Sequence, residues 1–393
     1  MKTLFATGKL GNLVELVSTS ENIELNFYQS PDKTKILIMQ TNPWVENRQF
    51  VEAAMYEAST FDKLWSKNLP AEFKNSPIET YYYNVDNAGN LYFLLNYLES
   101  DEPRLIGMGM GLLGAKTEKA KMLVLPNKNH YKIENGRAMI SADGKMVVGG
   151  LYKNTLKPDE DKMQNMSKKE KIKYEAELAK NKEVGVFSHI VDNATFAVTS
   201  DFKKFPDEVS EKLAYAEGLL SAGAGNKFYS SSKLEEVSGE FYLIENHRYG
   251  ITSGSTTFSV EREFVITKIN KQGTIAWTKI FPKNTGGELI TFNVLVNNGK
   301  LHLFYLEHPK NIKNNSIDNY DPLKYEQIAN YNGSVLVALE ISSDGSAVRE
   351  SLYENKGWCY DPQSFNILLE KDNSLLLRMI NRGEERFDVV KVK

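Results

Sequence analysis

The strongest constraint on the fold is a segment that the chain contains twice. FDKLWSKNLP occupies residues 61–70 and GTIAWTKIFP occupies residues 273–282. In both, Trp is followed by a small hydroxyl residue, Lys, one variable position, a bulky apolar residue and Pro. A platform that stacks on a carbohydrate is one interpretation of these tryptophans, but a binding site is usually unique. The repetition therefore predicts that Trp65 and Trp277 are mostly buried packing residues on equivalent strands of two repeated units.

Each Trp segment is followed by a second matched segment. YYYNVDNAGNLYFLLNY (81–97) and ITFNVLVNNGKLHLFYL (290–306) both contain two apolar strands around a turn at Gly89 or Gly299, where Asn and Gly supply the positive φ of a tight hairpin. Related turn-and-strand halves begin near residues 30, 141, 237 and 370. Recurring units of four short strands indicate a β-propeller. We therefore expect an all-β fold, a single propeller domain of six or seven blades over residues 1–393.

The widest gap between the repeats suggests an insertion. Residues 157–183 are almost entirely polar, with acidic residues first and Lys later, as in a solvated helix whose charges complement its dipole. Residues 184–205 return to a strand pattern, and residues 207–225 place apolar side chains on one helical face before a run of glycines. The sequence predicts a mostly helical insertion at 154–225, with two helices flanking a strand pair.

The second Trp unit carries a family resemblance. It is similar to the blades of uncharacterised propeller-like proteins of Bacteroidota-type bacteria, and the matching residues are Lys268, Ile269, Asn270, Gly273, Ile275, Trp277, Lys279 and Pro282. The likeness covers most of residues 30–360, including 185–209 and 299–353. Such relatives look like exported proteins of the cell envelope, so the resemblance implies a periplasmic or envelope location if a leader has been removed, and a cytoplasmic one otherwise. It brings no catalytic motif.

Composition narrows the classes of partner. The chain has 48 Lys and Arg against 51 Asp and Glu, which argues against nucleic-acid binding because such proteins usually carry a basic patch. Its single cysteine, Cys359, excludes an internal disulfide and a cysteine-based metal cluster. No apolar run approaches the length of a membrane helix, so we expect a chain that does not span a membrane. The apolar run in the first residues, MKTLFATGKLGN, is too short to be the core of a signal peptide.

Motifs for catalysis are weak throughout. Gly109, Gly111 and Gly114 form a G-x-G-x-x-G frame, but a dinucleotide site needs a βαβ unit that this region lacks, so a loop between blades is expected. The five histidines show no metal-ligand spacing, and residues 86–90 and 317–322 are better explained as turns than as calcium loops. We therefore predict no cofactor, no metal ligand and no catalytic residue from local motifs.

Acidic pairs leave one enzymatic alternative open. Glu235 with Glu236, or Glu261 with Glu263, could cleave glycosides only if the fold brought two carboxylates together at the separation such enzymes use. Sequence spacing does not show that separation. The expectation is that acids and metal ligands do not converge.

Two aromatic and polar segments, NHRYG at 246–250 and YDPLKYEQIANY at 320–331, look like exposed contact loops. The partner-binding residues predicted from them are His247, Arg248, Tyr249, Tyr320, Tyr325 and Tyr331. The leading hypothesis is a non-catalytic recognition or structural module of a bacterial cell envelope that binds protein partners, within a larger complex or with a glycan as the other ligand. The alternatives are a carbohydrate-active lyase or hydrolase with its site at the propeller funnel, and a cytoplasmic scaffold.

Overall fold

A computed structural model describes residues 24–41, 48–49, 51–69, 72–73, 78–98, 105–127, 132–154, 163, 166–171, 174, 183–220, 224–253, 256–286, 292–313, 317, 325–328, 333–354, 359–360, 367–369, 374–381 and 384–391. Contacts divide the chain into two compact units, Met1–Lys204 (unit 1) and Phe205–Lys393 (unit 2). Each unit is described on its own, and a single propeller domain over the whole chain stays a prediction. Within the described residues, no helix is both long and apolar enough to cross a membrane.

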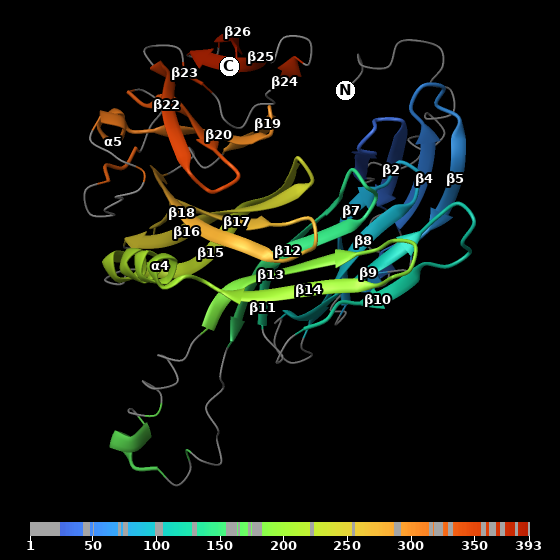
Figure 1. Ribbon diagram of the computed structural model, residues 1–393, viewed down its shortest axis with the longest axis horizontal. Helices are drawn as coiled ribbons and strands as arrows, with labels where there is room; N and C mark the ends of the chain where they lie inside the picture. Colours follow the sequence, from blue (N-terminus) through green and yellow to red (C-terminus); the bar gives the residue numbers. More distant parts are fainter. Residues whose placement is uncertain are drawn as a thin grey trace. The chain divides into compact units, whose positions relative to one another are not determined.

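Unit 1 is built from antiparallel sheets of four strands (Figure 1). Their strands, in spatial order, are β1 (Glu24–Gln29), β2 (Lys35–Thr41), β4 (Val51–Glu57) and β5 (Lys63–Asn68); β7 (Ile78–Val85), β8 (Leu91–Leu98), β9 (Leu105–Leu113) and β10 (Lys121–Val124); and β11 (Lys132–Ile140), β12 (Met146–Asn154), β13 (Glu183–Val191) and β14 (Val198–Lys204). A short pair, β3 (Arg48–Gln49) and β6 (Glu72–Phe73), lies apart from these sheets. The predicted succession of four-stranded antiparallel units is therefore present.

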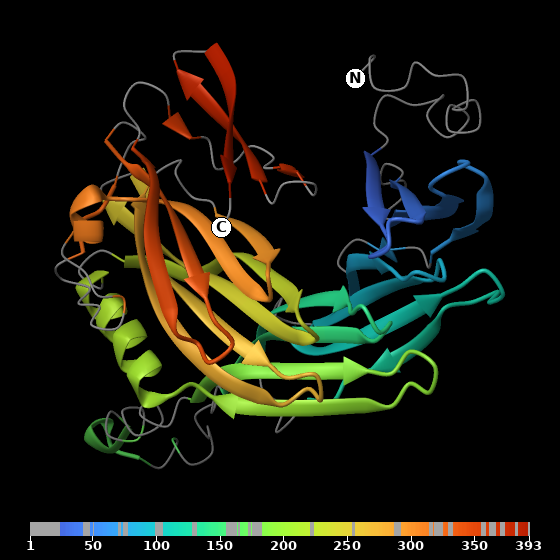
Figure 2. The same cartoon turned by 45° about the horizontal axis from the view of Figure 1, so that its top comes forward.

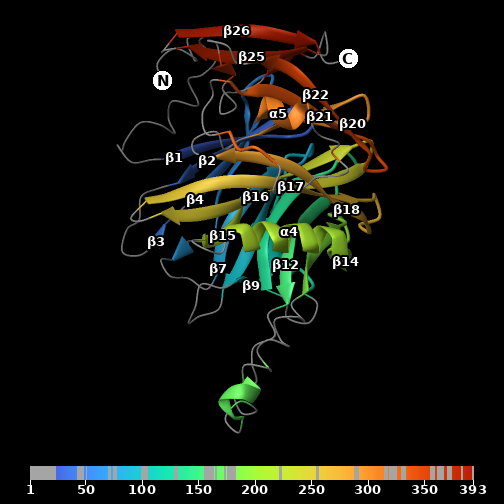
Figure 3. The same cartoon turned by 90° about the vertical axis from the view of Figure 1, so that its left-hand side faces the viewer.

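Unit 2 also contains four-stranded antiparallel sheets, and the strands of its first sheet, β15–β18, are longer. Its elements are α4 (Asp207–Leu220); β15 (Ala224–Val237), β16 (Glu240–Ser253), β17 (Thr256–Ile269) and β18 (Ile275–Gly286); β19 (Asn293–Asn297), β20 (Lys300–Glu307), β21 (Val335–Ile341) and β22 (Ala347–Glu354); α5 (Pro309–Lys313); and β23 (Cys359–Tyr360), β24 (Ile367–Leu369), β25 (Ser374–Asn381) and β26 (Glu384–Lys391). Figure 2 shows the long, twisted strands β15–β18 in yellow, and Figure 3 shows β25 and β26 running side by side. The chain is mostly β, as predicted.

The apolar core consists of layers between successive sheets within each unit. In unit 1, Phe93 of β8 packs in one cluster with Met55 of β4, and Met110 of β9 packs in another with Val148 of β12. In unit 2, the largest cluster joins the sheet β15–β18 to the sheet β19–β22, and its members include Ile244, Phe264, Leu303, Tyr305 and Val337. These strands alternate apolar side chains toward such layers because successive side chains point to opposite faces of a sheet.

The repeated Trp segments occupy the same place in two sheets. Trp65 is on β5 and Trp277 is on β18, the last strand of each four-stranded sheet. The indole N–H of Trp65 donates to the carbonyl of Gly89 at 2.9 Å, and that of Trp277 donates to the carbonyl of Ser343 at 3.1 Å. Both acceptors lie in hairpin turns of the next sheet in the chain. The prediction of equivalent strands is confirmed, with Trp65 buried and Trp277 half-buried.

The lysine two residues after each tryptophan completes the same contact. Lys67 Nζ donates to the carbonyls of Gly114 at 2.5 Å and Ala115 at 3.1 Å, while Lys279 Nζ donates to that of Gly345 at 2.8 Å. Each ammonium also lies 5.8 Å from the ring of its own tryptophan. The Trp-x-Lys motif therefore holds the turns of the following sheet, which explains why the chain uses it twice.

Replacing each tryptophan by phenylalanine tests this contact. Trp65→Phe keeps most of the ring but leaves the buried Gly89 carbonyl without its donor, so the free energy of unfolding should fall by about 1–3 kcal/mol. Trp277→Phe should cost less, because water can reach that half-buried position. Urea denaturation of both variants measures the difference, and equal, negligible losses would contradict the packing role.

The region predicted as a helical insertion contributes to a sheet. Strands β13 and β14 fall within 154–225. β13 pairs with β12, β14 pairs with β13, and together they complete the sheet that begins at β11. The expected helix after it is present as α4, with Val209 and Leu213 buried. Of the earlier helix at 157–183, only residues 163, 166–171 and 174 are described, and a capping box between Ser167 and Glu170 starts it. The rest of that segment lies outside the described residues.

The glycine-rich stretch at 107–114 is a strand and not the expected loop. Gly109 and Gly111 lie on β9, directly opposite β8. A Cβ atom on Gly111 would come within 2.1 Å of the Phe93 ring, and one on Gly109 would come within 2.8 Å of the Tyr97 hydroxyl. These glycines therefore leave room for aromatic rings of the neighbouring strand.

A buried histidine makes unit 1 sensitive to acid. His189 on β13 lies between Phe187 and Phe202, and its Nδ1 is 2.8 Å from the Ser200 hydroxyl. Burial lowers the pKa of His189 to about 4. The unfolded chain then binds a proton that the folded chain does not, so stability is lost as the pH falls from 6.5 toward 4, by up to about 3 kcal/mol. His189→Gln should remove this component from the pH dependence of urea unfolding, and identical slopes for both proteins would contradict it.

Candidate functional site

Unit 2 contains an unusual concentration of buried polar side chains. They lie on β16, β17, β18, β20 and α5, and the charged or ionisable members are fully or almost fully shielded from solvent. The set comprises Glu245, Asn246, His247, Glu261, Glu263, Lys283, Asn284, Thr285, Glu307 and Asn311. Charged groups are rarely buried unless they are paired, and burying them costs several kcal/mol per ion. We call these residues the polar cluster and treat it as the candidate functional site.

A bulge on β17 sends its two glutamates to opposite faces of the sheet. Glu263 is opposite His247 and Glu261 is opposite Arg248, so Arg262 is an extra residue on β17. Residues two apart normally share one face of a strand, but the extra residue reverses this for Glu261 and Glu263. Glu263 thereby meets His247, whose Nδ1 is 3.3 Å from the Glu263 carboxylate. Glu261 turns toward the face that carries Phe264.

The Glu261 carboxylate forms an ion pair with Lys283 of β18, and both side chains are fully buried. The Lys283 ammonium also lies 5.0 Å from the centre of the Phe264 ring. Phe264 in turn contacts Tyr305 of β20, with 5.2 Å between ring centres. Tyr305 and Glu307 are two residues apart on β20, so their side chains point to the same face of the sheet. The ion pair and Glu307 therefore border the same layer between the two sheets.

Glu307 ends β20 in a fully enclosed position. Its Oε1 accepts hydrogen bonds from the His308 backbone amide and from Asn311 Nδ2, both at 2.8 Å, and its Oε2 lies 3.6 Å from the Arg349 guanidinium. Burial raises the pKa of Glu307 to about 7, although its contacts with Asn311, His308 and Arg349 act in the opposite direction. At neutral pH this carboxyl therefore holds its proton about half of the time and can act as an acid.

Residues 325–328, which we call the strap, cover this part of the polar cluster. Asn284 Nδ2 donates to the Tyr325 carbonyl at 2.8 Å, and the amide of Ile328 donates to the Asn284 carbonyl at 3.1 Å. Asn311 holds the strap from the other side, accepting from the Glu326 amide at 2.8 Å and donating to its carbonyl at 2.7 Å. The Tyr325 hydroxyl accepts a hydrogen bond from Arg349. One asparagine thus contacts both Glu307 and the strap.

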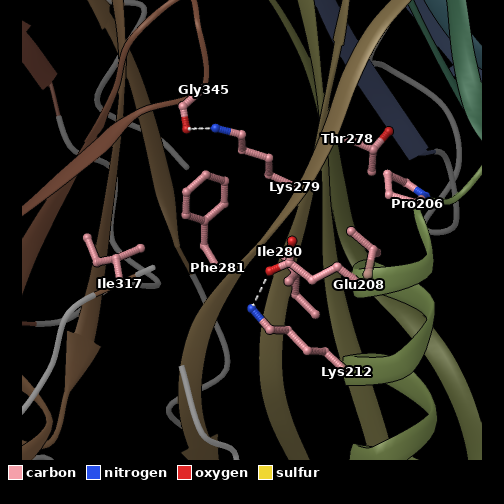
Figure 4. A pocket seen from close by; sticks show the side chains of 10 residues that line it. Pro206, Glu208, Lys212, Thr278, Lys279, Ile280, Phe281, Ile317 and Gly345 are labelled. Atoms are coloured by element: carbon pink, nitrogen blue, oxygen red, sulfur yellow. Dashed lines mark hydrogen bonds and ion pairs between the residues drawn. The ribbon is translucent and has the colours of Figure 1, made fainter. Parts of the chain in front are cut away.

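A separate pocket of about 260 Å³ lies between α4 and β18 (Figure 4). Val209, Ile280 and Phe281 supply buried apolar walls. Charged side chains lie nearer the solvent, where Lys212 forms an ion pair with Glu208 at 2.8 Å. This pocket contains a single carboxylate, so it does not provide the pair of acids that glycoside cleavage needs.

The residues predicted to bind partners lie in different places. His247, Arg248 and Tyr249 are inside strand β16 and not on a loop, and His247 is fully buried. Tyr325 is buried at 6% exposure beside Arg349. Tyr320 and Tyr331 lie outside the described residues. The expectation of an exposed loop at 246–250 is wrong, because the strands of this sheet extend well beyond their apolar halves.

The expectation that acids do not converge stays a prediction. Buried glutamates occur on β16, β17 and β20 of unit 2, and Glu245, which accepts from Ser232, shares the face of Glu263 and not that of Glu261. Across the described part of the chain, no group of His, Cys, Asp or Glu has the arrangement of a metal site. The turn at 86–90 has the predicted turn chemistry, since Asp86 accepts from the Asn90 amide at 2.8 Å.

Comparisons with known proteins give only distant likenesses. No family model and no curated protein matches the chain. Among solved structures, a mutant of the Synechocystis apocarotenoid oxygenase aligns with a TM-score of 0.37 and 9% identity over 86% of this chain and 64% of that one. The GH43_1 enzyme from Xanthomonas citri, complexed with xylotriose, gives 0.32 and 8% over 84% and 91%. A putative exo-β-1,3-galactanase from Bifidobacterium bifidum gives 0.37 and 8% over 84% and 91%.

These likenesses are too weak to support a fold or an activity for this chain, which also spans less than two thirds of the apocarotenoid oxygenases it matches. By their titles, one of these proteins was solved with xylotriose and another is a putative galactanase. The leading hypothesis fails at its predicted contact loop, because residues 246–250 lie in strand β16 and because His247 and Tyr325 are buried. A non-catalytic module that binds protein partners through long loops is therefore wrong as the main interpretation.

Proposed function

We propose that the protein is a carbohydrate-active hydrolase whose acid is Glu307 in the polar cluster of unit 2. The observation that carries the proposal is the fully buried Glu307 carboxyl with its pKa raised to about 7. Glycoside cleavage needs one carboxylic acid that is protonated at working pH and a second carboxyl group that is ionised. A buried acid with a pKa near neutrality supplies the first of these.

Glu261 is the residue we assign to the second role. It is the buried carboxylate at the same layer as Glu307, and it forms an ion pair with Lys283. In the proposed reaction, Glu307 gives its proton to the glycosidic oxygen as the bond to the anomeric carbon breaks. Glu261, at the opposite side of the sugar, takes one proton from a water molecule, whose oxygen forms the new bond to the anomeric carbon. His247 and Glu263 lie on the other face of the sheet and take no part.

The strap must move for a sugar to reach Glu307. Tyr325 places its hydroxyl against Arg349, next to the Glu307 carboxyl, where a sugar hydroxyl would find the same donor. We therefore propose that substrate replaces Tyr325 at Arg349. Asn284→Ala removes the hydrogen bond to the Tyr325 carbonyl, so it should raise turnover at low substrate concentration.

The proposed fold is a β-propeller in which each four-stranded sheet is one blade. Its support is the layering of successive sheets within each unit and the Trp-x-Lys contacts from the last strand of one sheet to the turns of the next. A location in the cell envelope, which the family resemblance implies, stays a prediction.

The test is release of reducing ends from a panel of plant and bacterial oligosaccharides. We expect measurable turnover by the wild type and by Asn284→Ala, and a loss of about 10²–10⁴-fold in Glu307→Gln, the usual size of a general-acid effect. Glu340→Gln, at a glutamate that forms an ion pair outside the cluster, is the matched control and should retain full activity. The proposal would be rejected if neither the wild type nor Asn284→Ala showed turnover, or if Glu307→Gln and Glu340→Gln had equal rates.

A further inference from the structure

The pocket between α4 and β18 has features of a small-molecule site that the proposed function does not use. Its walls come from a helix, a strand and two other segments, including Ile317 and Gly345. Val209, Ile280, Phe281 and Thr278 are all buried, at 3%, 7%, 3% and 8% exposure, so part of the lining is apolar, while Glu208, Lys212 and Lys279 add charged groups. Pockets that combine apolar walls with a few polar groups are typical small-molecule sites.

Two lysines and one glutamate give the pocket an excess of positive charge. Lys279 is anchored by the carbonyl of Gly345 at 2.8 Å, which fixes its ammonium beside the apolar walls (Figure 4). Lys212 has a side chain exposed to 20%, whereas that of its partner Glu208 is exposed to 73%. An ion pair with so exposed a carboxylate is worth about 1 kcal/mol or less. A second anion can therefore replace Glu208 beside Lys212 at little cost.

We propose that this pocket binds a small organic acid whose apolar tail lies against Val209, Ile280 and Phe281 and whose carboxylate faces Lys212 and Lys279. A neutral ligand of the same shape would gain the apolar contacts but leave the excess positive charge uncompensated. A short-chain fatty acid combines the apolar tail and the anionic head that this lining can contact. None of the lining residues belongs to the polar cluster around Glu307.

The experiment compares hexanoate with hexanamide by isothermal titration calorimetry and saturation-transfer NMR on the full chain. Hexanoate should bind saturably and at least tenfold more tightly than hexanamide. Lys212→Met should weaken hexanoate binding about tenfold without affecting hexanamide. Glu208→Gln should strengthen hexanoate binding, because it removes the carboxylate that competes for Lys212. These opposite effects of two neighbouring substitutions distinguish a specific site from general attraction to a basic surface.

Lys300→Met is the matched control, since Lys300 also forms a partly exposed ion pair, with Glu340, away from the pocket. It should leave hexanoate binding unchanged, and unchanged circular dichroism should show that each variant is folded. Equal affinities for acid and amide, equal effects of Lys212→Met and Lys300→Met, or no saturable binding of hexanoate would each overturn the proposal. Binding of oligosaccharides in competition with hexanoate would assign the pocket to glycans instead.

Discussion

Lys283→Met is expected to lower the free energy of unfolding of unit 2 by about 3–5 kcal/mol, because it leaves the Glu261 carboxylate buried without its partner. Both members of this ion pair are fully shielded from solvent, so water cannot replace the lost ammonium. Urea denaturation followed by tryptophan fluorescence, with Trp277 in the same strand as a reporter, measures the loss. The exposed pair of Lys300 and Glu340 is the control, and Lys300→Met should cost at most about 1 kcal/mol.

A double variant separates the pair's role in function from its role in stability. Glu261→Leu combined with Lys283→Met removes both charges, and replacing a buried pair by apolar side chains is often neutral or stabilising. We expect the double variant to recover most of the stability that Lys283→Met loses, yet to lack glycosidase activity. A double variant as unstable as Lys283→Met alone would contradict the idea that the unpaired Glu261 charge causes the loss of stability.

Glu307→Gln is expected to stabilise the protein at alkaline pH and to leave it nearly unchanged in mild acid. The reference pKa of a glutamate is 4.5, and burial raises that of Glu307 to about 7. Between these values the folded chain holds a proton that the unfolded chain has lost, so wild-type stability falls as the pH rises. The complete change corresponds to about 3 kcal/mol. Glutamine keeps the neutral form at every pH and can still accept the hydrogen bonds from Asn311 and His308.

The measurement is the difference in unfolding free energy between wild type and Glu307→Gln at pH 5, 6, 7 and 8. Subtraction removes the contributions of groups common to both proteins, including His189. The difference should grow in favour of the variant above pH 5 and level off above pH 7. A difference that does not change with pH would mean that Glu307 is ionised from pH 5 to 8 and that Arg349 compensates for the cost of burying its charge.

The repeat, the turns and the Trp positions were predictable because they depend on local chemistry. The hairpin turn at 86–90, for example, needs the positive φ of Gly89, which is observed at 77°, and the motif of Trp65 and Trp277 repeats in one register. The exact number of blades was not predictable in this way. The number of blades depends on how the sheets pack against one another, and no local sequence pattern predicts that packing.

The polar cluster was not predictable for a different reason. From the sequence, Glu261 and Glu263 look like ordinary polar residues at the end of a strand. They point to two different faces because of a bulge at Arg262, and no local sequence pattern predicts that bulge. His247 was assigned to a loop because polar residues surround it, whereas β16 extends across them. Glu307 was a signal that the sequence offered, because this charged residue ends the strand KLHLFYLE directly after the apolar run LFYL.

The functional proposal depends on one chemical statement, that the Glu307 carboxyl is protonated near neutral pH. Carbon-13 NMR of protein labelled at the glutamate side-chain carboxyl can follow it directly, with Glu307→Gln identifying the resonance. The proposal predicts a titration of that resonance with a midpoint near 7, well above that of the exposed glutamates. A midpoint near 4.5 would show an ordinary ionised carboxylate and would contradict the assignment of Glu307 as the acid.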